Sequence, residues 1–145
     1  MTCTFFGHSD CHGLDEIKLE RAIEMLISKG VDTFYVGHQG NFDSIVYACL
    51  KRLKATHPHI SFYVVLAYPP LQKATCFIPA DFTLFPEAAA AAPRRFAIDR
   101  RNRWMIDRSD FCLCYISHSW GGAYKFAHMA KRKGVETLNL GDFQL

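Results

Sequence analysis

Two adjacent glycines, Gly121 and Gly122, stand between an apolar run and a segment with helical spacing. Residues 111–116, FCLCYI, are nearly all apolar, which is typical of a strand that is covered on both faces. Small or apolar residues at 123, 126, 127 and 130 then predict a helix, which the basic residues 131–133 and Gly134 should end. A glycine turn between a parallel strand and a helix lets the first N–H groups of the helix face a phosphate. The alternative is a tight turn that binds nothing, since glycine is the usual residue in any tight turn.

Glycines and polar residues also follow two earlier predicted strands, at 2–6 and 33–36. In open α/β sheets, ligands bind outside the carboxyl ends of the strands, near the point where the strand order reverses. Three such loops at one edge of a sheet favour a ligand site over three unrelated turns. The predicted ligand-binding residues of these loops are Gly7, His8, Ser9, Asp10, Gly37, His38, Gly40, Asn41, Asp43, His118, Ser119, Gly121, Gly122, Ala123 and Tyr124.

A group of six arginines and two aspartates lies within residues 94–108. One interpretation is a solvated helix face on which Asp99 and Asp107 pair with arginines. The other is a phosphate contact, because positive charge is left over and a guanidinium binds phosphate through two parallel hydrogen bonds. Helical spacing makes Arg101 the arginine that we expect to face the ligand site.

Two other sets of residues have the right types for chemistry but the wrong pattern. His8, Cys11 and His12 are metal-ligand types, yet their spacing is not that of a zinc site. Ser9 has histidines and an aspartate nearby, yet the sequence has no G-x-S-x-G nucleophile elbow. We therefore predict no metal and no cofactor. Tyr124, in the first turn of a predicted helix, either stacks on a base or packs on the sheet.

The candidate residues need secondary structure to position them. Periodicity predicts strands at 2–6, 33–36, 61–68, 111–116 and 136–140, and helices at 15–29, 42–56, 97–108 and after the glycine pair. Because strands alternate with helices, we expect an α/β fold, a Rossmann-like three-layer sandwich with a central, mainly parallel five-stranded sheet. Residues 69–93 carry five prolines and are predicted to be an irregular connection of the kind that forms binding loops or lids.

Length and composition limit the classes of function. At 145 residues the chain is expected to form one domain, over 1–145. Its net charge of +3 is too small to predict nucleic acid or an anionic membrane as a main partner. The first residues lack the pattern of a signal peptide, and no apolar run reaches the roughly 18 residues of a membrane span. Six cysteines without a secretory signal indicate reduced thiols, so we expect a cytoplasmic protein with no membrane partner.

Four segments, which together cover most of the chain, carry a resemblance to a known superfamily. They are FFGHSD at 5–10, FYVGHQGNFD at 34–43, PRRFAIDRRNRWMIDRSD at 93–110 and YISHSWGGAYKFAHMAKRKG at 115–134. In order and spacing they resemble the SLOG superfamily, which includes the DprA/Smf proteins and the lonely-guy phosphoribohydrolases, and especially its small bacterial and phage members. The resemblance implies a Rossmann-like domain that binds a nucleotide or nucleotide-derived ligand, commonly as a homodimer.

The resemblance also bears on catalysis. The enzymes of the superfamily use an arginine on the helix before the fourth strand and a glutamate in a motif like PGGxGTxxE. Arg101 is similar in position to that arginine, but His128 stands at the glutamate position. A carboxylate for cleavage of a ribosyl bond would have to come from Asp10, Asp43 or Asp99.

These observations lead to two main expectations of function. The first is a protein that binds or senses a nucleotide-like small molecule with little or no turnover. The alternative is a nucleoside 5'-monophosphate phosphoribohydrolase, an N-glycosidase with Arg101 as a catalytic residue. DNA binding of the DprA kind is a weaker third alternative, because the net charge is small and no separate DNA-binding module is present.

Large apolar side chains at the predicted helix 97–107 suggest an interface. Phe96, Trp104 and Met105 accompany a polar stripe, so they belong either to the core or to a contact between subunits. We therefore expect a homodimer.

Overall fold

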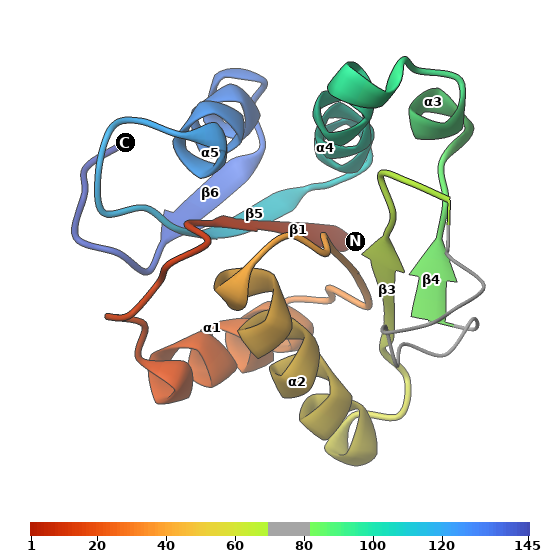
Figure 1. The fold of residues 1–145 in the computed structure, drawn as a ribbon. Helices are drawn as coiled ribbons and strands as arrows, with labels where there is room; N and C mark the ends of the chain where they lie inside the picture. Colours follow the sequence, from red (N-terminus) through yellow and green to blue (C-terminus); the bar gives the residue numbers. More distant parts are fainter. Residues whose placement is uncertain (70–81) are drawn as a thin grey trace.

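The computed structural model describes residues 1–69 and 82–145, which form one sheet flanked by helices (Figure 1). The sheet has six strands in the order β4-β3-β2-β1-β5-β6, and each neighbouring pair is parallel. The α/β prediction with a parallel sheet is thus confirmed. The strands are β1 Thr2–Gly7, β2 Thr33–Val36, β3 Ser61–Val65, β4 Thr83–Leu84, β5 Phe111–Tyr115 and β6 Glu136–Asn139.

Helices lie on both faces of the sheet, so the described residues form three layers. Helices α1 and α2 cover one face, and α4 and α5 cover the other (Figure 1). Their bounds are α1 Glu16–Ser28, α2 Asn41–Thr56, α3 Glu87–Ala90, α4 Ala97–Asp107 and α5 Gly122–Arg132. None of the helices in the described ranges is long and apolar enough to cross a membrane.

The ends of α1 and α5 have local causes, and the predicted end of the last helix before Gly134 is confirmed. The Asp15 carboxylate caps α1, since it accepts hydrogen bonds from the backbone N–H groups of Ile17 and Lys18 at 3.0 and 3.2 Å. Gly30 and Gly134, which follow α1 and α5, have positive φ angles of 101° and 86°. A residue with a side chain would be strained in that backbone conformation, which is why glycine stops both helices there.

Two predictions about the sheet are wrong. The sheet has six strands rather than five, because Thr83–Leu84 in the predicted irregular stretch pairs with the end of β3. Two residues are too few to show the period of a strand. β3 ends at Val65 instead of residue 68. Most of the rest of the predicted loop or lid, residues 70–81, lies outside the described residues.

The pleat of the strands divides the apolar side chains between two cores. Phe5 packs with α1 and α2, whereas its neighbour Phe6 packs with α4 and α5. Cys112 and Cys114 belong to the second core and are buried, so they pack as small hydrophobic residues. Strands β1 and β5 are thus covered on both faces, as is usual for the central strands of a parallel sheet.

The strand order reverses between β1 and β5. From β1 the chain builds outward through β2 and β3, then returns to place β5 on the other side of β1. The loops after these two strands therefore diverge to opposite faces of the sheet, which is where open α/β sheets leave a crevice.

Candidate functional site

A cleft of about 530 Å³ lies at the carboxyl ends of β1, β2 and β5 and against α4 and α5. Its volume is within the usual range for small-molecule sites, about 300–1,000 Å³. The three predicted loops do meet here, and Arg101 joins them from α4. The predicted residues that line the cleft are Gly7, His8, Ser9, Asp10, Gly37, Asp43, Arg101, His118, Gly121, Gly122 and Ala123.

Five predicted residues are not among those that line the cleft. His38, Gly40, Asn41 and Ser119 belong to the same loops but are exposed beside it. Gly40 and Asn41 instead join the second loop to the first, because the Asn41 N–H donates to the Ser9 carbonyl at 3.0 Å. Tyr124 is turned to another surface, described below.

Sequence reasoning missed several residues of the cleft wall. Some were predictable by adjacency, since Gln39 and Asn102 neighbour predicted residues and Trp120 stands directly before the glycine pair. The apolar residues could not be predicted from the sequence, because the same apolar residue types occur in the core and in the wall of a cleft. The missed lining residues are Phe5, Phe6, Gln39, Ile98, Asn102, Met105, Trp120 and Phe126.

The N-terminus of α5 opens directly on the cleft. No side chain caps this helix, and a Cβ atom added at Gly121 or Gly122 would meet nothing within 4 Å. Gly121 has φ of 91°, which turns the loop into the helix. The first N–H groups of a helix lack partners within the helix and carry its positive dipole end, so this turn can receive an anion.

Arg101 is a buried cation in the wall of the same cleft. Its side chain is only 2% exposed, and it donates from Nη1 to the Val65 carbonyl at 2.8 Å and from Nε to Asn102 Oδ1 at 2.7 Å. A guanidinium has five N–H donors, so these two bonds hold it in place and leave donors for a ligand. Burial lowers the pKa of Arg101, while the nearby Asp43 carboxylate acts to raise it.

Asp43 is the counter-charge of Arg101. Burial raises the pKa of Asp43 to about 6, and the Gln39 N–H, which donates to it at 2.8 Å, and the charge of Arg101 limit the shift. A Cβ atom at Gly37 would lie 3.0 Å from both Asp43 Oδ2 and Arg101 Nη1. Glycine at this position therefore lets the two charged groups approach each other at the cleft.

Three flat rings stack at the edge of the cleft. The His8 and His118 rings are 3.6 Å apart between centroids, and His118 and Trp120 are 3.8 Å apart. The Ser117 N–H donates to Nε2 of His8 at 3.1 Å, so that nitrogen is unprotonated. Burial and the neighbouring His118 lower the pKa of His8, which keeps the innermost ring neutral.

Tyr124 and His128 face a second, separate surface. Their rings stack at 5.6 Å in a groove that Arg103, Lys125 and Arg132 also line. Tyr124, which was predicted to bind the ligand, thus lines this groove and not the cleft. His128 is likewise absent from the described wall of the cleft. An α-helix turns by 100° per residue, so a helix that starts in the cleft carries most of its later residues away from it.

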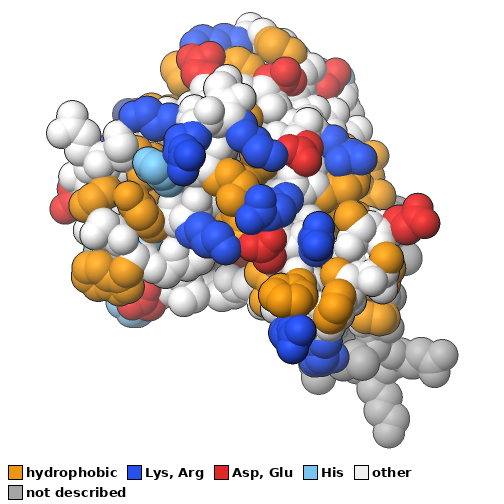
Figure 2. Space-filling model, turned by 90° about the horizontal axis from the view of Figure 1, so that it is seen from above, with side chains coloured by type: hydrophobic (Ala, Val, Ile, Leu, Met, Phe, Trp, Pro, Cys, Tyr) orange, Lys and Arg blue, Asp and Glu red, His pale blue; other side chains and the backbone are white. Residues whose placement is uncertain are grey.

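The other arginines of the 94–108 stretch point outward. Figure 2 shows Lys and Arg side chains gathered on the face that α4 and α5 present to solvent. Asp99 pairs with Arg103 at 2.5 Å and with Lys125 at 3.0 Å, while Asp107 pairs with Lys133 rather than with an arginine. The solvated-face interpretation thus describes most of this stretch, and Arg101 is the exception.

Within the described part of the chain, no group of three or more His, Cys, Asp or Glu side chains is placed to hold a metal ion. Cys11 is buried and does not form a metal-binding group with His8 and His12. Its sulfur instead accepts a long contact of 4.0 Å from the side-chain amide of Asn41.

The chain was also compared with known proteins. It matches no protein-family model, and no curated protein matches it.

Proposed function

We propose that the protein binds a nucleotide or nucleotide-derived small molecule in this cleft. The observation that carries the proposal is the pairing of two anion-binding groups, because the buried Arg101 guanidinium and the uncapped N-terminus of α5 line one cleft. Each of these two groups favours a phosphate. A phosphate that contacts both would be held by backbone N–H groups and by a full positive charge.

The rest of the wall suits the remainder of such a ligand. Phe5, Phe6 and Phe126 supply apolar surface, and Asp10 and Gln39 supply polar groups near the strand ends. Ligand sites typically combine a mainly apolar wall with a few polar groups that fix orientation. A phosphate attached to a larger organic group fits this division better than a free inorganic anion.

The experiment that tests the proposal replaces Gly122 by valine. The added side chain meets no protein atom within 4 Å of Cβ, so the variant should fold with an unchanged melting temperature. It would, however, keep a phosphate away from the N–H groups of α5. We expect AMP to bind the variant about 10- to 100-fold more weakly by calorimetry, since a hydrogen bond to a charged group contributes about 1.5–3 kcal/mol.

The matched control is Ser119→Val, which places the same valine side chain in the same loop but outside the cleft wall. It should bind AMP as the parent does. Equal affinity of the parent and of a folded Gly122→Val variant would show that phosphate does not bind at this turn.

A second candidate function, cleavage of a nucleoside monophosphate, is supported by the two carboxylates of the cleft. Asp10 and Asp43 both line it, and an oxocarbenium-like transition state needs a nearby negative charge. Against it, His128 occupies the position of the glutamate of the resembled enzymes and lies on the second surface. We therefore favour binding without turnover.

We also propose a homodimer, with Phe96 in the interface. Met105 is 1% exposed and belongs to the core, and the ring of Trp104 packs on Tyr35 with 5.1 Å between the ring centroids. Of the three large apolar residues predicted for the interface, Phe96 is therefore the one that is exposed, by 46%. Sedimentation at about 20–50 micromolar, where a stable interface persists, should give particles of twice the 16.5 kDa chain mass. Phe96→Asp should return them to single chains. Single chains of the parent at that concentration would contradict the proposal.

A further inference from the structure

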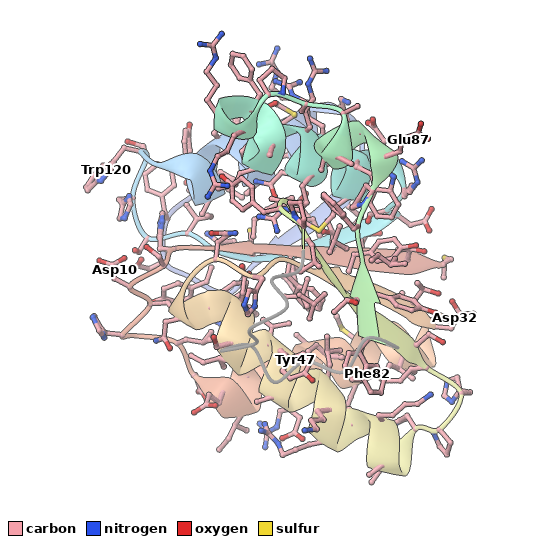
Figure 3. All side chains as sticks on the ribbon, turned by 45° about the vertical axis from the view of Figure 1, so that its right-hand side comes forward. Asp10, Asp32, Tyr47, Phe82, Glu87 and Trp120 are labelled. Atoms are coloured by element: carbon pink, nitrogen blue, oxygen red, sulfur yellow. The ribbon has the colours of Figure 1, made fainter. Side chains whose placement is uncertain are left out.

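Trp120 is an exposed aromatic residue that the fold does not use. Its side chain is 68% exposed, the most of any large hydrophobic residue in the described ranges, and it belongs to neither of the two core clusters. Figure 3 shows it projecting from the same side of the molecule as Asp10, which also lines the cleft. A large apolar group kept in water beside a cleft indicates a contact surface.

The orientation of Trp120 is set although the residue is exposed. Its ring lies on His118 at 3.8 Å with an interplanar angle of 19°, and His118 lies on His8 at 3.6 Å with an angle of 18°. His8 is 5% exposed and anchored by the Ser117 N–H, so the innermost ring is fixed to the protein. The three stacked rings thus extend from the buried core to the rim of the cleft, and the indole is held parallel to the ring of His118.

Only one face of the Trp120 ring is covered. His118 covers the inner face, and the large exposed fraction leaves the outer face free. Aromatic side chains such as indole stack on nucleobases, because every nucleobase has a flat π-face. Trp120 also directly precedes Gly121 and Gly122, so a ring on the indole and a phosphate at the start of α5 can belong to one molecule.

We propose that the outer face of Trp120 is the platform for the base of the ligand, and that the ligand is a purine nucleotide. This inference rests on the proposed function, because it assigns the base of the same ligand whose phosphate binds at α5 and Arg101. A purine is favoured over a pyrimidine because its two fused rings cover more of the indole. The stack of His8, His118, Trp120 and base would then be continuous from the core to the ligand.

The test uses two phosphate probes, AMP and ribose 5-phosphate, which has a hydroxyl group in place of the base. The chain has two tryptophans, and Trp104→Phe leaves Trp120 as the single indole. In this background we expect AMP to quench the fluorescence of Trp120 and ribose 5-phosphate to leave it unchanged. By calorimetry, AMP should bind the parent about 5- to 150-fold more tightly than ribose 5-phosphate, the range that corresponds to stacking of one base. CMP should lie between them.

The decisive variant is Trp120→Ala, with Trp120→Phe as the conservative replacement. Because the side chain is exposed, Trp120→Ala should melt at the temperature of the parent. Its affinity for AMP should fall to that for ribose 5-phosphate, which should itself not change, and Trp120→Phe should recover part of the loss.

The outcomes separate this inference from the function on which it rests. If ribose 5-phosphate binds and AMP binds no more tightly, or if Trp120→Ala binds AMP like the parent, the role of Trp120 is overturned and phosphate binding stands. If neither probe binds the parent, the proposed function fails and this inference fails with it.

Discussion

Binding of AMP should fall by about 100-fold or more when Arg101 is replaced by methionine in an Asp43→Asn background, since two charge-assisted hydrogen bonds are worth about 3 kcal/mol together. Arg101 is the single Arg or Lys side chain among the described residues that line the cleft. Methionine keeps the apolar stem and removes the charge. The background is needed because Arg101→Met alone would leave Asp43 buried beside no cation, which would destabilise the fold and blur the result.

Two controls locate the effect. Asp43→Asn alone should keep most of the AMP affinity, because the guanidinium remains, but it should melt at a lower temperature than the parent, because the buried Arg101 then lacks its counter-charge. Arg103→Met removes a cation from the exposed side of α4, where it pairs with Asp99 at 2.5 Å, and should leave AMP binding unchanged. Affinity of the double variant within about threefold of the parent, with an unchanged melting temperature, would exclude Arg101 as the phosphate contact.

The same proteins decide between binding and cleavage. AMP incubated with the parent should release no adenine, which chromatography detects directly. Release that persists in Asp43→Asn and is lost when Arg101→Met is added would replace the binding function by the glycosidase, with Arg101 in its catalytic role. Release that survives there but is lost on changing Asp10 would assign the chemistry to other residues of the cleft.

Replacing Gly7 by alanine should cost about 3 kcal/mol of the free energy of unfolding, the upper part of the range for overpacking a core. A Cβ atom at Gly7 would lie 2.2 Å from Cγ of Phe42 and 2.3 Å from one of its Cδ atoms. Phe42 is fully buried at the start of α2, so its ring cannot move aside without disturbing the helix. Glycine here allows α2 to pack against the end of β1, which brings the first and second loops together at the cleft.

Gly122→Ala is the matched control for this prediction. It adds the same methyl group at a glycine of the same cleft, but nothing lies within 4 Å of the new atom and the φ angle is not positive. Its free energy of unfolding in urea should stay within about 0.5 kcal/mol of the parent value. A loss below about 1 kcal/mol for Gly7→Ala would mean that Phe42 repacks easily and that the loop geometry does not depend on this contact.

The sequence by itself determined five of the six strands that the structure describes, the four longer helices, and the end of the sheet at which its polar loops meet. Local signals were sufficient for this, because a strand or helix shows its period within its own residues and Gly134 marks the end of a helix within one turn. The three glycine-containing loops followed from the same reasoning. Parallel strands all point one way, so any residues directly after them must gather at one edge.

Tertiary structure alone decided which residues of these loops and helices turn into the cleft. Tyr124 and Trp120 are both aromatic and lie on either side of the glycine pair, but Trp120 lines the cleft and Tyr124 a second groove. Among neighbouring arginines, Arg101 is buried and Arg100 is exposed. The two residues of each pair are of the same chemical kind, so residue type could not predict which of them faces the cleft. The outcome depended on how far each helix is rotated against the sheet, and that rotation is set by the packing of side chains such as Phe6, Met105 and Phe126, which are distant in the sequence.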